Sequence, residues 1–348
     1  MKLYRKIETE AADYNFFCPV FNGDRLIYFV LNKDGKAVIR CEDIAGKKTV
    51  WEHRLDKAMQ GSCVRRLYGG IMWQGQILFA TEHNIFSLNL ETGLKQFDIE
   101  TETHRSELTV VGDFLFAVNW NEIIKIDLLK GKIVKRKKYR VKWLVAPVLE
   151  DSGRLYAATS NSKILRISKD DLSADLEYKY PGSWSVGVPA GIAGDSLVGS
   201  SYSQYVISFD KNTGEPVWKK KKKTGSEPSQ VIDAANGVIY HCENINNEMI
   251  TALRISDGKK LWSLEAAIWS LTDIDSDTMV GFLKSADVYE FVKISKKTGD
   301  IIPVEEAPEM HERREEPFCG FRMPAEIACS AELVAFACGT GDIYVFEK

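Results

Sequence analysis

The motifs that would assign a chemistry are missing from this 348-residue sequence. It has no GxSxG, P-loop or GxGxxG motif, and its five histidines have no metal-ligand spacing with cysteine or with one another. Its seven cysteines include no CxxC pair and no adjacent pair. The acidic segment Asp273–Asp277 lacks the glycine and the distal glutamate of a calcium loop, so we interpret it as a turn. We therefore expect free thiols, no metal, no Ca²⁺ and no enzyme activity.

Signals for export and for membrane insertion are also missing. No apolar stretch follows Met1–Glu8, and no run approaches the about 20 apolar residues of a transmembrane helix. The 46 basic and 49 acidic residues give a net charge of −3, which favours neither nucleic acid nor a membrane as the partner. We expect a cytoplasmic protein that binds neither of them.

An internal repeat is what the sequence does contain. Each copy is typical of a strand, a tight turn with glycine and a second strand, and in the clearer copies the second strand opens with an aromatic residue. The copies are Val38–Trp51, Phe86–Phe97, Ile124–Val134, Val206–Trp218, Ala252–Trp262 and Val292–Ile302, with a degenerate copy at Ile164–Asp171 that has lost its glycine. We expect the aligned Trp51, Trp218 and Trp262 to pack between neighbouring units.

The spacing of the repeat predicts the architecture. The turn glycines fall at positions 46, 93, 131, 214, 258 and 299, and the gap of 83 between 131 and 214 holds two units. Upstream segments such as Pro147–Thr159 and Val231–His241 add two strands to each copy, so a unit has four short strands in roughly 42 residues, the size of a propeller blade. The segment from Pro324 to Lys348 supplies three strands only, and Leu3–Lys6 resembles the outer strand at Val217–Lys220.

These observations predict a single all-β domain over residues 1–348. It is an eight-bladed β-propeller of four-stranded blades, in which the N-terminal strand completes the C-terminal blade and closes the ring. The expected blades are 13–56, 66–100, 106–140, 143–180, 184–223, 227–265, 267–305, and 322–348 with 1–10.

The xxLDxxTGxxxW frame of these copies resembles the PQQ-like repeat family of quinoprotein-like propellers. That family includes quinoprotein alcohol dehydrogenases and the outer-membrane β-barrel assembly lipoprotein. The resemblance implies that the dehydrogenases need an adjacent cysteine pair, which is absent here, so we expect no PQQ and no other cofactor. The export and lipid signals of the assembly lipoprotein are absent as well.

Two groups of residues are candidates for binding a partner. Aromatic residues lie just before the first strand of several blades, where they could surround one mouth of the propeller as interface anchors: Tyr14, Phe16, Trp143, Trp184 and Trp269, with Arg322 at a similar place. Packing between blades is the alternative interpretation of this group. The segment Pro303–Phe318 interrupts the repeat as a polar loop and supplies Glu305, Glu306, His311, Arg313 and Arg314, with a solvated loop as its alternative.

The basic runs Lys132–Lys142 and Lys219–Lys223 are interpreted as charged outer edges that prevent pairing between sheets. The sequence favours a non-catalytic, monomeric scaffold that presents one funnel face to another protein. Two alternatives stay open: a cytoplasmic immunity or accessory protein that binds a toxin or enzyme, and a ligand-binding, sugar-binding or enzymatic propeller that uses the funnel aromatics.

Overall fold

The computed structural model describes residues 1–9, 19–31, 37–55, 68–81, 84–101, 107–181, 187–201, 205–221, 230–243, 249–286, 288–308, 310–311, 327–338 and 342–348. All regular secondary structure in these ranges is β-strand. Within the same ranges, no helix is long and apolar enough to cross a membrane.

The described strands form eight antiparallel sheets, each with four strands in a continuous order and one with an additional short strand, and each sheet is one blade of an eight-bladed β-propeller. The predicted fold class is therefore confirmed. The chain divides into two compact units, Met1–Asp98 with Trp269–Lys348, and Ile99–Ile268. Apart from the ends of β9 and β26, each unit holds four whole blades, and the two units are described separately.

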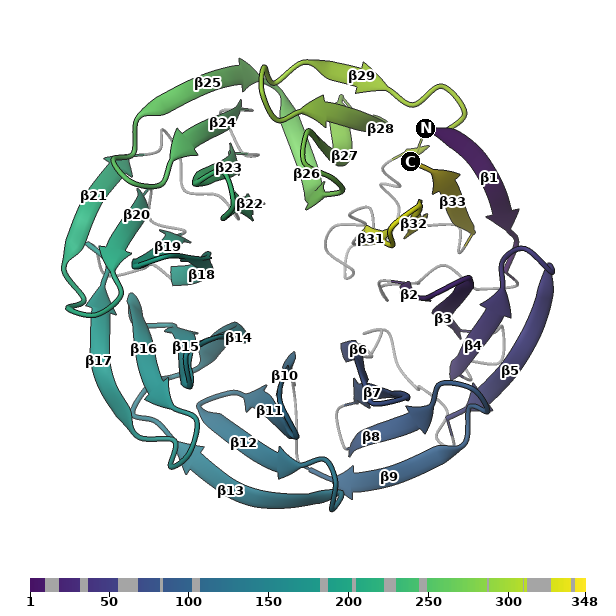
Figure 1. The fold of residues 1–348 in the computed structure, drawn as a ribbon, viewed down its shortest axis with the longest axis horizontal. Coiled ribbons are helices and arrows are strands. Elements are labelled where there is room, and N and C mark those ends of the chain that lie inside the picture. The colour runs from purple at the N-terminus through teal and green to yellow at the C-terminus, as the bar shows by residue number, and fades with distance from the viewer. Residues whose placement is uncertain are drawn as a thin grey trace. The chain divides into compact units, whose positions relative to one another are not determined.

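The first unit, at the two ends of the chain, contains blades 1, 2, 7 and 8 (Figure 1). Blades 1 and 2 consist of β2 (Val20–Asn22), β3 (Arg25–Leu31), β4 (Ala37–Asp43) and β5 (Lys48–Arg54), followed by β6 (Tyr68–Trp73), β7 (Gln76–Ala80), β8 (Asn84–Asn89) and β9 (Lys95–Glu100). Blades 7 and 8 consist of β26 (Ala267–Asp273), β27 (Thr278–Ser285), β28 (Val288–Ser295), β29 (Ile301–Pro303) and β30 (Met310–His311), followed by β31 (Ala328–Cys329), β32 (Leu333–Ala337), β33 (Ile343–Glu347) and β1 (Lys2–Ile7).

The second unit contains blades 3 to 6. Blades 3 and 4 consist of β10 (Glu107–Val111), β11 (Phe114–Asn119), β12 (Glu122–Asp127) and β13 (Lys132–Lys138), followed by β14 (Leu144–Asp151), β15 (Arg154–Thr159), β16 (Lys163–Ser168) and β17 (Ala174–Lys179). Blades 5 and 6 consist of β18 (Gly187–Ala193), β19 (Ser196–Ser201), β20 (Tyr205–Asp210) and β21 (Pro216–Lys221), followed by β22 (Gln230–Asp233), β23 (Val238–Glu243), β24 (Met249–Arg254) and β25 (Lys260–Glu265). The first strands of successive blades lie next to one another, and the fourth strands form the outer edge (Figure 1).

Blade 8 is completed by the opposite end of the chain, as the sequence predicts. Strand β1 pairs antiparallel with β33, with Leu3 opposite Phe346 and Lys6 opposite Tyr344. In Figure 1 the purple β1 lies beside the yellow β33. The two chain ends therefore share one sheet, and β33 has no unpaired edge.

Blade 7 extends beyond its expected end at residue 305. Strand β29 pairs with one part of β28, and after a short excursion β30 pairs farther along the same strand, with Met310 opposite Tyr289 and His311 opposite Val288. The segment that the sequence assigns to a loop between blades 7 and 8 therefore begins as an interruption within the outer edge of blade 7.

The apolar core is divided among the interfaces between neighbouring blades. One cluster joins Phe116 and Ile123 of blade 3 to Leu155 and Ile167 of blade 4. Inner strands are buried on both faces for this reason: β12 is buried along its whole length, whereas most of β13 is exposed. A blade is therefore stable only against its neighbours, as in other repeat proteins.

Tryptophans of the repeat fasten one blade to the next. The Trp218 Nε1 atom of blade 5 donates a hydrogen bond to the carbonyl oxygen of Ile255 in blade 6, at 2.6 Å. The Trp218 ring lies against Gly258, where a Cβ atom would come within 2.7 Å of the ring. In the first unit, Trp51 donates to the carbonyl of Leu90 at 2.9 Å in the same manner. The packing role predicted for Trp51 and Trp218 is thus confirmed.

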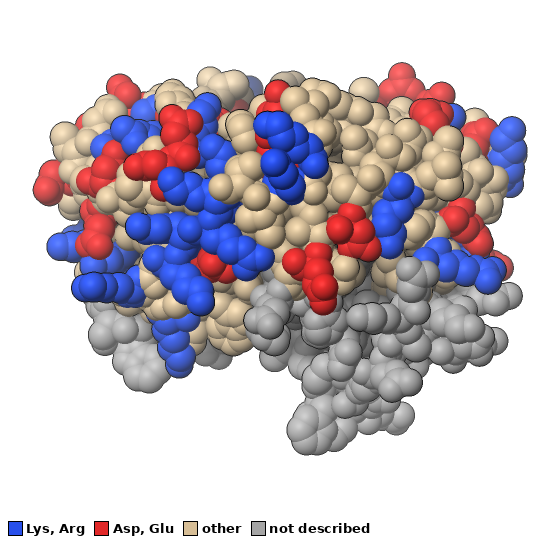
Figure 2. Space-filling model, turned by 90° about the horizontal axis from the view of Figure 1, so that it is seen from below, with Lys and Arg blue, Asp and Glu red and all other residues tan. Residues whose placement is uncertain are grey.

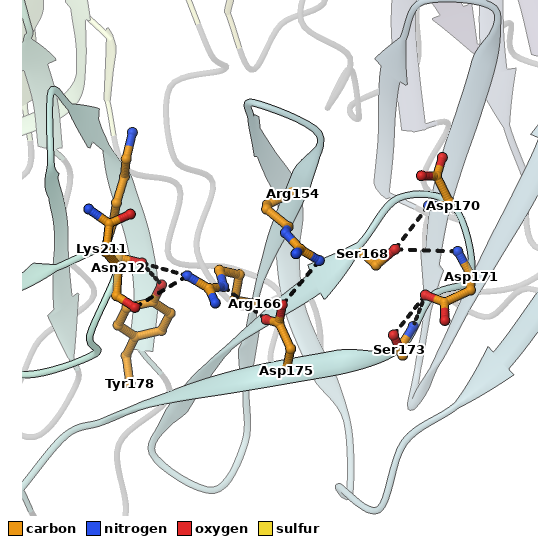
Figure 3. Close-up of polar contacts among 10 residues, drawn as sticks. All are labelled: Arg154, Arg166, Ser168, Asp170, Asp171, Ser173, Asp175, Tyr178, Lys211 and Asn212. Carbon is orange, nitrogen blue, oxygen red and sulfur yellow. Dashed lines mark hydrogen bonds and ion pairs between the residues drawn. The ribbon is translucent and has the colours of Figure 1, made fainter.

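Other blade junctions use the same carbonyl position, three residues before the turn glycine or its substitute, with different donors. At the junction of blades 4 and 5, the hydroxyl of Tyr178 donates to the carbonyl of Lys211 at 2.6 Å, and Arg166 donates to it at 3.1 Å (Figure 3). At the junction of blades 3 and 4, Lys125 donates to the carbonyl of Lys169 at 2.9 Å. The position of the acceptor is therefore shared between junctions that do not share a donor.

Candidate partner-binding surface

Six of the residues predicted to bind a partner lie outside the described residues. They are Tyr14, Phe16, Trp184, Arg313, Arg314 and Arg322. Their roles stay predictions. The structure places the other five, Trp143, Trp269, Glu305, Glu306 and His311, in both units of the chain.

Trp269 does not belong to an exposed surface. It is the third residue of β26, and its side chain is only 8% exposed. It packs with Phe282 and Phe336 in the cluster between blades 7 and 8. Its Nε1 atom has no hydrogen-bond acceptor among the described residues. The packing interpretation therefore fits this residue, because the strand begins earlier than the aromatic pattern suggests and turns the indole toward the neighbouring blade.

Trp143 lies in the link between β13 and β14 and is half-buried. Its backbone N–H donates to Ser160 Oγ at 3.2 Å, and its carbonyl accepts from the Ser160 N–H at 2.9 Å. Ser160 belongs to the turn between β15 and β16, so blade 4 holds the link between blades 3 and 4 in place. The Lys142 Nζ atom lies 4.5 Å from the centre of a Trp143 ring, which is a cation–π contact.

Trp120 belongs to the same place, although the sequence analysis does not identify it. It occupies the two-residue turn between β11 and β12, with a φ of +45°, and is 49% exposed. Its carbonyl accepts a hydrogen bond from the N–H of Leu144, and the carbonyl of Asn121 accepts one from Tyr139. The available signal was a tryptophan in a tight turn, where glycine, asparagine or aspartate is the usual residue.

Basic residues precede Trp143 in the chain, along β13 and the link that follows it. Seven of the eleven residues in 132–142 are Lys or Arg, and none is acidic. Arg136 lies 3.6 Å from the carboxylate of Glu122. The described carboxylates form no ion pair with Lys137, Lys138, Arg140 or Lys142, all of which are exposed.

Figure 2 shows the side of the molecule on which β13 lies in Figure 1, and Lys and Arg side chains gather over part of it. Lys138 pairs across the strands with Glu122, directly after the turn of Trp120, so the basic residues and the tryptophans share one end of blade 3. We call this group the Trp–Lys surface; it consists of Trp120, Lys137, Lys138, Arg140, Lys142 and Trp143.

The acidic pair Glu305 and Glu306 lies in the other unit, where both residues are exposed in the turn after β29. The Glu306 Oε2 atom accepts a hydrogen bond from the backbone N–H of Leu3 at 2.5 Å, so this carboxylate is attached to β1 of blade 8. His311 pairs through its backbone with Val288. Glu306 and His311 thus each contribute to the pairing of strands, whereas Glu305 is exposed and has no such role among the described residues.

The described residues offer little for covalent or metal chemistry. No group of three or more His, Cys, Asp or Glu side chains among them could hold a metal ion. Three of the described cysteines, Cys41, Cys242 and Cys329, are free thiols. Burial raises the pKa of Cys41 and of Cys329 to about 11, so both thiols stay protonated at neutral pH and are poor nucleophiles.

Burial has the opposite effect on the lysine inside the junction of blades 3 and 4. It lowers the pKa of Lys125, whose Nζ atom lies 4.1 Å from the centre of the Phe114 ring and donates to the Lys169 carbonyl. Burial raises the pKa of Tyr139 at the same junction and of Tyr178 at the junction of blades 4 and 5, so both phenols stay protonated and can donate. These polar groups serve the blade junctions, whereas Lys137, Lys138, Arg140 and Lys142 of the Trp–Lys surface are exposed.

Comparison with known proteins identifies the fold and the repeat. A solved structure of BamB from Moraxella catarrhalis is similar over 99% of each chain, with 14% identity and a TM-score of 0.71. A computationally designed protein, Ika8, is similar over 100% of each chain, with 12% identity and a TM-score of 0.74. A search of curated proteins gives no match.

A sequence model of the family described as outer membrane protein assembly factor BamB matches residues 150–300 and 202–346. Together these matches span more than half of the chain. They cover the copies of the repeat around Trp218 and Trp262, which carry the xxLDxxTGxxxW frame most clearly. The chain therefore belongs to the PQQ-like repeat family of β-propellers, whose sequence model bears the description of the assembly factor BamB.

Proposed function

We propose that this protein is a non-catalytic scaffold that binds another protein through one end of its blades. The observation that carries the proposal is the Trp–Lys surface, where an exposed tryptophan, a half-buried tryptophan and four basic side chains that form no ion pair with a described carboxylate lie at the junction of blades 3 and 4. Tryptophan and arginine are the residue types that most often anchor protein interfaces. The family description, an assembly factor, supports the same class of function.

The junctions suit such a role because they hold the surface in one conformation. Leu144 and Tyr139 fix the turn of Trp120, and Ser160 fixes the backbone of Trp143. A binding surface that is ordered before it meets its partner loses less conformational entropy on binding. The scaffold in this proposal acts in the cytoplasm as a single propeller, without a cofactor and without turnover.

Site-specific photo-crosslinking tests the proposal. A photoreactive phenylalanine analogue replaces Trp120 in one variant and Trp143 in another, in the full chain expressed in its native cell. Leu261 on β25 is the matched control, because it is exposed to a similar extent on an outer strand of the same unit. We expect a discrete protein adduct from positions 120 and 143 and none from position 261. Absence of any adduct, or equal adducts from all three positions, contradicts the proposed function.

A further inference from the structure

We propose that the outer edge of β13 binds an acidic, extended segment of a partner protein, which adds to blade 3 as a further strand. The inference rests on the proposed function and names the chemistry of the partner, because β13 ends at Lys138 in the Trp–Lys surface. It follows from three properties of the described residues: the open edge of β13, the single sign of its charge, and the placement of that charge on both faces of the strand.

The open edge is the first property. β13 is the last strand in the order β10-β11-β12-β13, and no described strand pairs with its outer side (Figure 1). Every second residue of such a strand directs its backbone N–H and C=O groups away from the sheet, where another extended chain can pair with them. The pairing with β12 skips Val134, so Lys135–Lys138 is the regular stretch that we expect to receive the segment.

The sign of the charge is the second property. Five of the seven residues of β13 are Lys or Arg, and none is acidic. Of these five, Arg136 alone forms an ion pair with a described carboxylate, that of Glu122 at 3.6 Å. Charged side chains on an edge prevent pairing between sheets, but β5, β9, β17 and β25 serve that purpose with acidic and basic residues together. Protection of the edge therefore does not explain why β13 carries one sign only.

The remaining outer strands differ from β13 in other ways. β21 carries three lysines, but it begins with Pro216, which has no N–H group to pair with a further strand. β29 carries no charged residue. β1 is basic, but Arg5 forms an ion pair with Glu42 and Lys6 forms one with Asp342. Among the described outer strands, β13 thus combines an edge free of proline with a row of cations that mostly have no described carboxylate partner.

The placement of the charge is the third property. Lys135 and Lys137 share one face of β13, and Arg136 and Lys138 share the other. Lys135 lies directly opposite Lys125 of β12, and like charges in this position are unfavourable. An added strand brings its side chains within about 5 Å of those of β13, so acidic residues at successive positions would each meet a cation. A second copy of this edge would bring lysine against lysine, so the charge that excludes pairing between copies selects an acidic strand.

The same strand favours a polypeptide over nucleic acid. β13 has no aromatic residue on which a base could stack. A phosphate backbone also has no N–H groups for the outward carbonyls of the edge, whereas an extended polypeptide has one at every second residue. A polypeptide therefore complements both the charge and the backbone of β13.

Hydrogen exchange of the full chain, measured residue by residue, tests the proposal with the peptide Thr-Glu-Glu-Val-Glu-Glu-Thr as the probe. In the free chain we expect every second amide of Lys135–Lys138 to exchange fast, because its N–H group points to solvent. With saturating peptide we expect those amides to exchange at least about tenfold more slowly, since an added strand supplies their acceptors. Binding of the peptide without protection of these amides would overturn the inference.

Fluorescence anisotropy of the labelled peptide separates strand addition from charge attraction. The comparison probes are the same peptide with its interior backbone amides methylated, the same peptide with Lys in place of Glu, and a labelled oligothymidine. We expect the original peptide to bind more tightly than all three, because methylation keeps the charge and blocks the backbone pairing. Equal binding of the methylated peptide would overturn strand addition, and tighter binding of oligothymidine would overturn the inference in favour of nucleic acid.

Two pairs of variants locate the binding edge. We expect Lys137→Gln with Lys138→Gln to weaken binding of the peptide about tenfold, with the melting temperature unchanged because both side chains are exposed. The matched pair on β21, Lys219→Gln with Lys220→Gln, should change the affinity less than about twofold. Equal losses in both pairs would show nonspecific attraction, and no loss in the first pair would show that the lysines of β13 do not select the segment. Either result overturns the inference.

The outcome remains separable from the proposed function. If crosslinking yields a protein adduct at positions 120 and 143 but the purified partner leaves the amides of Lys135–Lys138 unprotected, the scaffold stands and strand addition is wrong. If no adduct forms at any position, the scaffold itself is wrong, whatever the peptide does.

Discussion

Two blade junctions of the second unit solve one packing problem differently. Between blades 5 and 6, Trp218 lies flat on Gly258 and donates to the carbonyl of Ile255. Between blades 3 and 4, the tryptophan position holds Lys135 and the glycine position holds Leu172, which is fully buried and has a φ of +60°. At the junction of blades 3 and 4 the large residue, Leu172, comes from the second blade of the pair. At the junction of blades 5 and 6 the large residue, Trp218, comes from the first.

The difference shows which part of the repeat the fold requires. Both junctions keep a left-handed residue at the turn and a hydrogen bond to the carbonyl three residues before it, from Trp218 in one and from Lys125 in the other. The residues at the tryptophan position and at the glycine position can vary, provided that one of the two side chains that fill the junction is large when the other is small. A repeat can thus lose its sequence signature at a junction and keep its geometry.

Among the substitutions considered, Gly258→Ala at the junction of blades 5 and 6 should lower the free energy of unfolding most. We expect a loss of about 3 kcal/mol of unfolding free energy, roughly 1 from the left-handed conformation and about 2 from the clash with the Trp218 ring. Gly237→Ala is the matched control, since Gly237 has a φ of +64° and no atom near its missing Cβ. Denaturant unfolding measures both, and equal losses would contradict the role of the close approach to Trp218.

Leu172→Gly tests whether the leucine substitutes for tryptophan. Relief of the left-handed strain regains about 1 kcal/mol, but the loss of a fully buried leucine costs about 3, so we expect a net loss of about 2 kcal/mol. Adding Lys135→Trp should recover part of this loss by restoring the pair seen at Trp218 and Gly258, while Lys135→Trp alone should destabilise by overpacking against Leu172. A double-mutant cycle measures the coupling, and additive effects would show that the two positions do not share the space.

The tyrosine hydroxyls at the blade junctions should contribute less to stability than the packing residues. Tyr139→Phe removes the only hydrogen bond that the described residues give to the carbonyl of Leu172, and we expect a loss of about 1 kcal/mol. Tyr178→Phe should cost less, because Arg166 also donates to the carbonyl of Lys211. The unfolding midpoints of the two variants decide the order, and a larger loss for Tyr178→Phe would contradict this account.

Trp120→Gly should have the smallest effect on stability and the opposite sign. Leu172 and Trp120 are both left-handed residues of the second unit, but Leu172 is buried and Trp120 is half exposed. We therefore expect a gain of up to about 1 kcal/mol for Trp120→Gly. Trp120→Asn serves as its control, since asparagine tolerates the same conformation. A loss of stability in both variants would show that Trp120 stabilises the fold by packing, and would contradict the difference we infer between Trp120 and Leu172.

The sequence by itself determined the number of blades and the pairing of the chain ends. The turn glycines mark the repeated units, and the last unit lacks an outer strand, which the resemblance of Leu3–Lys6 to such a strand supplies. The role of Trp218 followed for the same reason, because the repeat places it at a fixed distance from its glycine.

Only the tertiary structure decided which aromatic residues are exposed. Trp143 and Trp269 have similar places in the sequence pattern, yet one is half-buried beside Lys142 and the other lies in the core between two blades. Trp120 stands in a turn that the repeat does not mark, and its position next to Trp143 depends on hydrogen bonds from Tyr139 and Leu144. Exposure and proximity are properties of the neighbouring blade as much as of the residue, so the pattern of one blade cannot fix them.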